Sequence, residues 1–323
     1  MRTLRHFDLL PADARGAAIA LGNFDGVHRG HAAVIEAARD AARCHRLPLA
    51  ALTFEPHPRE VFRPHDPPFR LTLAEAKAEA LAALGVDLLY ELQFDEAFSR
   101  VSAEAFIVNV LGRTLGARHV ACGPDFHFGH RRTGTPALLA TLGPAHGIGV
   151  TVVPEATDEA GGELSSTAVR DALRAGDLAR AEAILGRPWD IRGPVARGAA
   201  LGRTLGFPTA NVPLGRHLVP RLGIYAVEAS TDGTTWLPGV ASLGLRPTVN
   251  PLPCPLLEVH LFDVSPDLYG RELRVRLRAF LREEARFPDL DALVRQMRRD
   301  AAEARSLLAG GPPARNDGSA AQV

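Results

Sequence analysis

A glycine-rich turn with two histidines carries the clearest chemical signal in the sequence. Residues 20–31 read Ala-Leu-Gly-Asn-Phe-Asp-Gly-Val-His-Arg-Gly-His, between the apolar run 17–21 and an alanine-rich stretch of helical periodicity. Such a turn lets backbone N–H groups approach phosphate oxygens, and the following helix N-terminus carries a partial positive charge. The sequence therefore predicts a phosphate site. There His28 and His31 would hydrogen-bond the phosphate oxygens on which charge develops, and Gly30 would keep the backbone open.

Other interpretations of this pair of histidines stay open. They could be surface residues at the start of a helix, or zinc ligands, although no third ligand stands nearby at a convincing spacing.

Three further polar motifs follow predicted strands of the same half. Glu-Pro-His-Pro at 55–58 stiffens a loop, although alone it is more typical of a turn. Residues 123–132 (Gly-Pro-Asp-Phe-His-Phe-Gly-His-Arg-Arg) combine aromatics that could wall a flat ring with arginines suited to phosphate; a loop that buries its aromatics explains them equally well. Ser-Ser-Thr at 165–167, with Arg170, could meet phosphate from a second side or simply cap a helix.

Composition narrows the class of protein. The chain has 323 residues, 46% hydrophobic and 23% charged, with a formal net charge of zero. This length suffices for two domains, and the neutral balance argues against a general nucleic-acid binder. No apolar run approaches a membrane span and the N-terminus lacks signal-peptide features, so no membrane association is expected. Three scattered cysteines (Cys44, Cys122 and Cys254) indicate a reducing cytoplasm.

The elements that must position these motifs alternate through residues 1–186. Strand–helix alternation predicts parallel pairing, hence a doubly wound α/β sheet with ligands beyond the carboxyl ends of its strands. We expect five strands, at 17–22, 47–54, 86–92, 119–123 and 149–154, and helices at 30–45, 73–84, 103–115, 136–146 and 168–175.

The sequence pattern changes near residue 187, where the alternation of strands and helices ends. Short apolar runs separated by Gly and Pro predict five or six antiparallel strands and a small barrel over 187–308. Strands are expected at 191–196, 223–229, 236–243, 256–263 and 272–281, followed by an amphipathic helix at 289–308. The remaining tail, 309–323, is expected to be disordered.

Together and in this order, the four motifs resemble the adenylyltransferase module of the bacterial bifunctional riboflavin kinase/FAD synthetase (FMN adenylyltransferase) family. The resemblance extends from Ala17 to about Leu308. Residues 202–211 (Gly-Arg-Thr-Leu-Gly-Phe-Pro-Thr-Ala-Asn) resemble the riboflavin kinase signature, and residues 257–263 resemble the strand that bears the catalytic glutamate of the family. The chain departs from the family where Ser242 replaces a usual Asn and Leu245 a usual Thr.

The resemblance implies a Rossmann-like nucleotidyltransferase domain (1–186) followed by a riboflavin kinase-like barrel with a C-terminal helix. It implies phosphorylation of riboflavin to FMN and adenylylation of FMN to FAD, with ATP as co-substrate and Mg²⁺. The catalytic residues would be Glu258, His28 and His31. The residues expected to contact ATP in the first domain are Gly22, Asn23, Phe24, Asp25, Gly26, His28, Gly30, His31, Ser165, Ser166, Thr167 and Arg170. Those expected to contact the flavin there are Phe54, Pro56, His57, Pro58, Asp125, Phe126 and Phe128. Those expected to contact ATP in the kinase are Gly202, Arg203, Gly206, Phe207, Pro208, Thr209 and Asn211, with Thr209 and Asn211 as metal ligands.

Three competing hypotheses are a chain with only one of the two activities, an adenylyltransferase for another substrate such as a phosphopantetheine-like one, and a non-catalytic flavin carrier. The intact motifs of both halves argue against each. The sequence leaves open whether the chain forms homo-oligomers or makes transient contacts with apo-flavoproteins.

Overall fold

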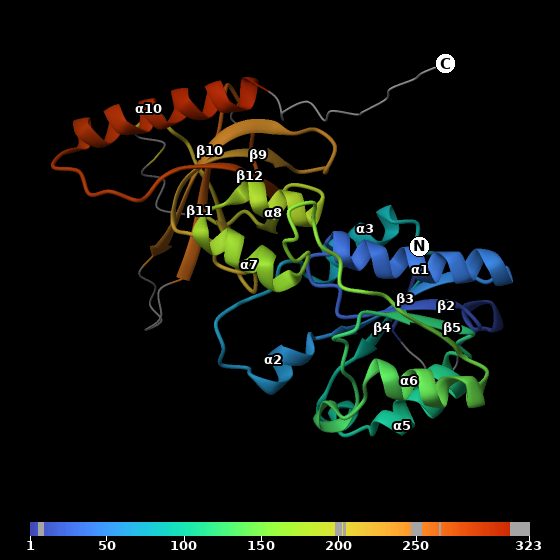
Figure 1. Ribbon diagram of the computed structural model, residues 1–323. Helices are drawn as coiled ribbons and strands as arrows, with labels where there is room; N and C mark the ends of the chain where they lie inside the picture. The colour runs from blue at the N-terminus through green and yellow to red at the C-terminus, as the bar shows by residue number, and fades with distance from the viewer. Residues whose placement is uncertain (6–9, 198–201, 203–204, 247–253, 265, 311–323) are drawn as a thin grey trace, which may run out of the picture. The chain divides into compact units, whose positions relative to one another are not determined.

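The computed structural model describes residues 1–5, 10–197, 202, 205–246, 254–264 and 266–310 (Figure 1). The chain forms two compact units. The first comprises Met1–Val169 and Ile184–Gly186, and the second comprises Arg170–Ala183 and the chain from Arg187 onward.

A six-stranded parallel sheet forms the centre of the first unit, in the order β1-β4-β3-β2-β5-β6. The five expected strands are present, and the structure adds one at the edge, β1, which at three residues is too short to show a period. The strands are β1 (Arg2–Leu4), β2 (Ala18–Leu21), β3 (Leu49–Glu55), β4 (Leu88–Gln93), β5 (His119–Cys122) and β6 (Gly149–Val152).

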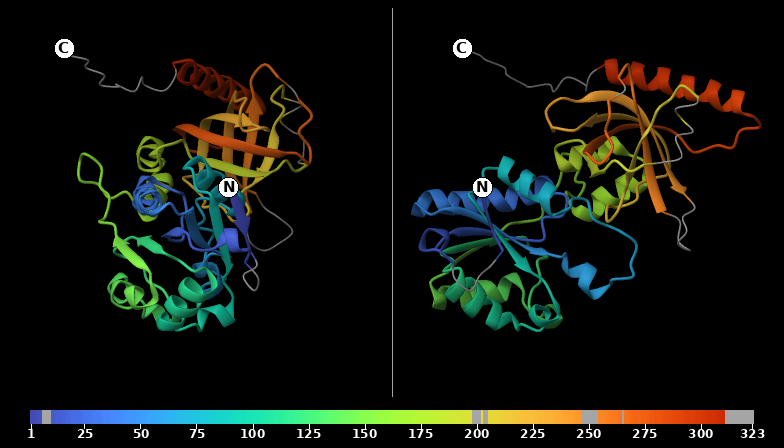
Figure 2. Two further views of the ribbon diagram at one scale, coloured as in Figure 1. Left: turned by 90° about the vertical axis from the view of Figure 1, so that its right-hand side faces the viewer. Right: turned by 180° about the vertical axis from the view of Figure 1, so that it is seen from behind.

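Helices cover both faces of this sheet (Figures 1 and 2), as a doubly wound fold requires. Side chains of β2 show why: Ala18 and Ala20 pack in one core with α1, whereas Ile19 and Leu21 pack in the other. The expected helices are present, with a π-helix completing the third. The helices are α1 (Arg29–His45), α2 (Pro58–Phe62), α3 (Ala74–Ala83), α4 (Glu96–Ser99), α5 (Ala103–Ala105) with the π-helix Phe106–Thr114, and α6 (Pro136–Leu142) with the 3₁₀ turn Gly143–His146.

Six antiparallel strands form a nearly closed barrel in the second unit, in the order β7-β12-β9-β10-β11-β8. An isolated bridge between Ala196 and Asn211 joins its two edges. The strand that the sequence did not separate, β8, begins at the last two residues of the predicted motif 202–211. The strands are β7 (Asp190–Pro194), β8 (Ala210–Pro213), β9 (Gly223–Ser230), β10 (Leu237–Arg246), β11 (Cys254–Leu261) and β12 (Glu272–Arg282).

Three helices accompany the barrel. The expected C-terminal helix is α10 (Leu290–Ala309), whose N-cap is Asp289, and its Ala304 packs on Ala226 and Phe262. Helix α7 (Ser166–Ala175) begins in the first unit and ends in the second, and α8 (Leu178–Leu185) was not predicted. Most of the expected disordered tail, residues 311–323, lies outside the described residues.

Candidate functional site

The glycine-rich turn joins the carboxyl end of β2 to α1. Two non-glycine residues of the turn, Phe24 (φ 51°) and Val27 (φ 44°), have left-handed backbone, and both side chains are buried. At Gly30 a Cβ would lie 2.5 Å from the carbonyl oxygen of Leu164. Gly30 therefore has a packing reason to be glycine: it lets α1 approach the backbone just before the Ser-Ser-Thr motif.

His28 is the N-cap of α1 and is only 6% exposed. Its Nδ1 accepts a hydrogen bond from the backbone N–H of His31 at 3.3 Å. The two imidazole rings stack with centroids 3.6 Å apart, and Phe24 packs edge-on against His31 at 5.2 Å. The structure thus holds both predicted histidines together at a helix N-terminus, where the positive end of the helix favours anionic groups.

The Ser-Ser-Thr motif meets this turn directly. Ser166 Oγ donates a hydrogen bond to the carbonyl oxygen of Asp25 at 2.8 Å, although 141 residues separate them. Ser165 Oγ accepts the N–H of Ala168 and caps α7. The two motifs predicted to meet phosphate from two sides therefore share one place, with Thr167 exposed beside them.

The side chain of Asp25 is only 2% exposed, and it fixes the turn to the chain around Arg70. Its carboxylate accepts the backbone N–H groups of Leu71 and Thr72, both at 3.0 Å. Thr72 Oγ1 in turn accepts the N–H of Gly26 at 3.0 Å. This structural role of the Asp25 side chain was not predicted from the sequence.

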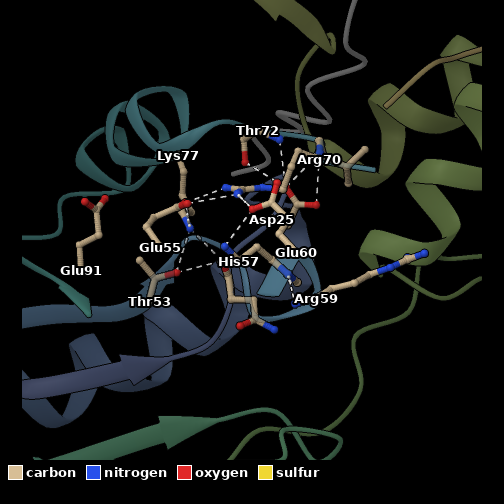
Figure 3. A network of polar contacts seen from close by, with 12 residues as sticks. Asp25, Thr53, Glu55, His57, Arg59, Glu60, Arg70, Thr72, Lys77 and Glu91 are labelled. Atoms are coloured by element: carbon tan, nitrogen blue, oxygen red, sulfur yellow. Dashed lines mark hydrogen bonds and ion pairs between the residues drawn. The ribbon is translucent and has the colours of Figure 1, made fainter. Parts of the chain in front are cut away.

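A buried network of charged side chains lies beneath the turn (Figure 3). Arg70 is 1% exposed, and its guanidinium contacts both carboxylate oxygens of Glu55, at 2.6 and 3.1 Å. The same guanidinium reaches Glu60 at 3.0 Å. Lys77 is fully buried, with its Nζ 2.7 Å from Glu55 and 3.1 Å from Thr53 Oγ1. Sequence reasoning missed this network because charged residues are rarely buried unless they are paired.

Burial and charge oppose each other in this network. Burial alone would raise the pKa of Glu55, but the hydrogen bond from Arg70 and the charge of Lys77 outweigh it and hold that pKa below its usual value. Burial lowers the pKa of Lys77, and the carboxylate of Glu55 opposes this only in part. Burial also acts to lower the pKa of Arg70, yet the bond to Glu55 raises it overall. The charges of Glu55 and Arg70 are thus stabilised by their partners, whereas for Lys77 burial outweighs the attraction of Glu55.

A cavity of about 690 Å³ opens beside the turn. Five of the seven residues expected to contact the flavin line it (Phe54, His57, Pro58, Phe126 and Phe128), whereas Pro56 and Asp125 do not. Arg131 and Arg132, the arginines predicted to suit phosphate, also line this cavity. Sequence reasoning missed four further aromatic residues of the lining (Phe62, Phe94, Phe98 and Phe106) and two basic residues at α2 (Arg59 and Arg63). These residues lie far apart in the sequence, so only the fold reveals that they share a cavity.

The loop at 129–134 is tightly built. Arg131 (φ 53°) and Arg132 (φ 59°) both have left-handed backbone, which costs about 1–2 kcal/mol for each L-residue. A Cβ at Gly129 would lie 2.6 Å from Ala103, and one at Gly134 would lie 2.5 Å from the ring of Phe128. Strain held by such packing is typical of functional loops.

The barrel carries two cavities, of about 490 and 390 Å³. Thr209 lines both. Pro208 lines only the larger cavity, and Gly202, Phe207 and Glu258 line only the smaller. Of the other residues expected to contact ATP, Gly206 is exposed and lines neither of these cavities, and Arg203 lies outside the described residues.

Glu258 faces the smaller cavity from β11. On β11 its cross-strand neighbours are Ser242 of β10 and Asn211 of β8. Ser242, the position that departs from the family pattern, lines the same cavity, whereas Leu245 is exposed. The sequence could not decide whether Glu258 faced inward, and the structure includes it in the lining of the smaller cavity.

The far wall of this cavity comes from α10. The carboxylate of Asp300 accepts hydrogen bonds from Arg282 Nη2 at 2.6 Å and Nε at 2.9 Å, and from Gln296 Nε2 at 2.8 Å. The two bonds from Arg282 fix α10 to the end of β12. Sequence reasoning missed them because the helix was interpreted only as barrel packing.

No cluster of three or more His, Cys, Asp or Glu side chains suited to a metal ion occurs among the residues that the structure describes. The two predicted metal ligands are of other types, a hydroxyl (Thr209) and an amide oxygen (Asn211, 7% exposed). Both are hard oxygen donors, which fit Mg²⁺.

The first unit has a glycine-rich turn suited to phosphate on a parallel sheet, and the second unit is a small barrel with two cavities. Together these features define a two-domain nucleotide-dependent transferase. Family models for FAD synthetase and riboflavin kinase match residues 10–168 and 185–308. The chain belongs to the bifunctional riboflavin kinase/FMN adenylyltransferase family.

Several relatives bear that family name. The relative from Escherichia coli K12 is 44% identical over 95% of this chain and 97% of its own. The relative from Pseudomonas fluorescens is 44% identical over 96% and 98%, and the one from Bacillus subtilis 36% over 92% and 94%.

A crystal structure described as a macrolide-efflux protein from Streptococcus pneumoniae is 30% identical, with a TM-score of 0.83, and covers 94% of this chain and 99% of that one. In the part of this chain that the structure describes, no helix is long and apolar enough to cross a membrane.

Proposed function

We infer that the chain catalyses two successive ATP-dependent reactions, phosphorylation of riboflavin to FMN in the barrel and adenylylation of FMN to FAD in the parallel-sheet unit. One observation carries this proposal: both family models match this chain, and its likeness to the relatives extends over nearly their full length. We place the domain boundary near residue 186, close to residue 185, where the riboflavin kinase model begins; the FAD synthetase model ends at residue 168.

For the kinase, we assign riboflavin to the cavity that Glu258 borders and ATP to the neighbouring cavity. Glu258 then accepts the proton of the ribityl hydroxyl. The hydroxyl oxygen attacks the γ-phosphorus of ATP, and ADP leaves. Thr209, which lines both cavities, stands where the transferred phosphoryl group must pass. General-base assistance is typically worth about 10²–10⁴-fold, and positioning about 7–11 kcal/mol.

We propose that Thr209 and Asn211 hold a Mg²⁺ ion for the kinase. The ion would neutralise charge on the phosphates of ATP. Asn211 is the cross-strand neighbour of Glu258 in the β8–β11 register, and this pairing supports a metal ligand close to the base.

For adenylyl transfer, the phosphate of FMN supplies the nucleophile. Its second pKa is about 6, so near neutral pH it is largely dianionic and needs no protein base. Its oxygen forms a bond to the α-phosphorus of ATP as the bond to pyrophosphate breaks. His28, His31 and the N-termini of α1 and α7 then stabilise charge that grows on the phosphates.

We assign the flavin ring of FMN to the aromatic cavity of the first unit. Aromatic walls such as Phe54, Phe126 and Phe128 suit a flat ring, and stacking favours such contacts. Arg131 and Arg132 at its rim suit the FMN phosphate. Asn23 belongs to both the turn and the lining of this cavity, which supports an FMN phosphate close to ATP.

The test is an incubation of the full chain with riboflavin, ATP and Mg²⁺, with flavins followed by chromatography. We expect FMN first and FAD after it, and neither product when the metal is chelated. FMN without FAD would refute the bifunctional assignment. The cytoplasmic location expected from the sequence stays a prediction, as do the homo-oligomer and the contact with apo-flavoproteins.

A further inference from the structure

We propose that Arg70 is a positioning residue that makes the binding of FMN and ATP cooperative in the adenylyltransferase unit. It would do so by joining the nucleotide turn (residues 22–28) to the flavin loop (residues 55–62). The inference rests on the proposed function of this unit, because it takes ATP to be the ligand of the turn and FMN that of the aromatic cavity.

The nucleotide turn depends on the segment that begins at Arg70. Asp25 Oδ1 lies 3.8 Å from Arg70 Nε, and its carboxylate accepts the next two backbone N–H groups of that segment. A movement of Arg70 would therefore reach the turn through three contacts with one carboxylate. From the turn, Ser166 Oγ bonds the carbonyl of Asp25, so the start of α7 would follow.

The flavin loop depends on the same guanidinium. Arg70 makes two hydrogen bonds to Glu55 at the end of β3 and one to Glu60 in α2. Glu60 also accepts the N–H of His57 at 3.0 Å, and His57 Nδ1 accepts the N–H of Arg59. His57, Arg59 and Phe62 all line the aromatic cavity, so Arg70 sets the position of part of its wall.

Charge explains why these two parts share one cation. Three carboxylates (Asp25, Glu55 and Glu60) face two buried cations (Arg70 and Lys77), and only Arg70 contacts all three. A planar guanidinium can bind several carboxylates at once, whereas an ammonium group is a point charge. A ligand that orders the flavin loop would thus stabilise the position of Arg70 that the nucleotide turn also needs. Such coupling between sites is typically 5–150-fold.

The test is a matrix of initial rates of FAD formation by the full chain over FMN and ATP concentrations. FAD formation reports only the adenylyltransferase site, although the barrel also binds flavin under the proposed function. In the wild type, we expect saturating ATP to lower the KM for FMN at least about fivefold. In Arg70→Lys, which keeps the charge, we expect this factor to fall to about one.

Two further variants guard the interpretation. Arg39→Lys is the matched control and should keep the wild-type factor. Arg39 of α1 bonds Glu36 on the same helix and the carbonyl of Leu84 at the end of α3, and it lines none of the three cavities described here. Glu60→Gln removes the charge that pairs with Arg70 on α2, whereas its amide oxygen can still accept the N–H of His57. It too should lower the factor towards one, and it serves as the test if Arg70→Lys fails to fold. Unchanged riboflavin phosphorylation shows that the barrel of each variant is intact.

The outcomes separate the two proposals. The inference would be overturned if saturating ATP left the KM for FMN unchanged in the wild type. It would also be overturned if ATP lowered this KM in folded Arg70→Lys, or in Glu60→Gln, as much as it does in the wild type. No FAD from FMN in the wild type would instead refute the proposed function of the unit.

Discussion

The Nδ1 atom of His28 accepts the backbone N–H of His31, and the two imidazole rings stack 3.6 Å apart at the first turn of α1. One histidine thus caps the helix whose N-terminus both histidines border. The pair can serve phosphate chemistry only while this cap holds α1 in place, so a substitution at residue 28 mixes two effects that need separate variants.

Two variants at His28 separate capping from catalysis. Asn is a good N-cap residue but has no imidazole, so His28→Asn should keep α1 intact while FAD formation from FMN falls about 10²–10³-fold. His28→Ala should lose the cap as well, at a cost of about 1 kcal/mol in unfolding free energy. Riboflavin phosphorylation should stay near wild type in both. Near-normal FAD formation by His28→Asn would show that the residue only caps the helix.

The second prediction concerns Glu258. Glu258→Gln keeps the size of the side chain and removes its basicity, so riboflavin phosphorylation should fall about 10²–10⁴-fold. FAD formation from supplied FMN should be unchanged. The measurement is chromatography of flavins from each substrate in turn, and a kinase rate within threefold of the wild type would contradict the assignment of Glu258 as base.

Thr209 allows a test of the metal site. Thr209→Val removes the hydroxyl at nearly constant shape, whereas Thr209→Ser keeps it. We expect the valine variant to need at least about tenfold more Mg²⁺ for half-maximal kinase activity, because one oxygen ligand is lost. The serine variant should resemble the wild type. Equal Mg²⁺ requirements in the two variants would argue against a metal contact at Thr209.

The strained arginines at the rim of the aromatic cavity give a fourth prediction. Glycine tolerates left-handed backbone, so Arg131→Gly and Arg132→Gly should not lower the unfolding free energy and could raise it by up to about 1 kcal/mol. The KM for FMN in FAD formation should nevertheless rise about tenfold, because a phosphate partner is lost. Thermal melts and initial rates on the same samples test both parts, and an unchanged KM would remove these arginines from the site.

The cysteines give a prediction on reactivity. Burial, aided by the charge of Asp125, raises the pKa of Cys122 to about 11, whereas Cys44 is exposed. The thiolate is the reactive form, so at pH 8 a small alkylating reagent should modify Cys44 and leave Cys122 largely unmodified. Peptide mapping by mass spectrometry checks this, and rapid alkylation of Cys122 in the folded chain would contradict its burial.

The sequence predicted the elements better than the contacts between them. Long periodic segments such as 30–45 and 289–308 are helices within one residue of the expected bounds. Strand β1 was missed because three residues show too little alternation. Strand β8 was missed because it begins inside the motif 202–211, which was interpreted as a phosphate-binding loop. The prediction of the fold class was still correct, because it depended on the alternation of strands and helices and not on each short strand.

The site was predictable where neighbours in sequence act together. The His-x-Gly-His and Ser-Ser-Thr motifs were found from local patterns, and the structure joins them. Arg70 and Lys77 gave no local signal, because their partners come from other segments of the unit and only folding pairs them. Only part of the lining of the aromatic cavity was predicted, because its other residues come from segments far apart in the sequence.

The path of α7 and α8 decides how this enzyme can be dissected. Residues 170–183 lie with the barrel although the riboflavin kinase model begins at residue 185. Arg221 donates its backbone N–H to the carbonyl of Leu173, and Arg278 pairs with Glu182. A kinase fragment cut at the family boundary would therefore lack two helical partners of its own strands, and a fragment that starts at residue 170 would keep them.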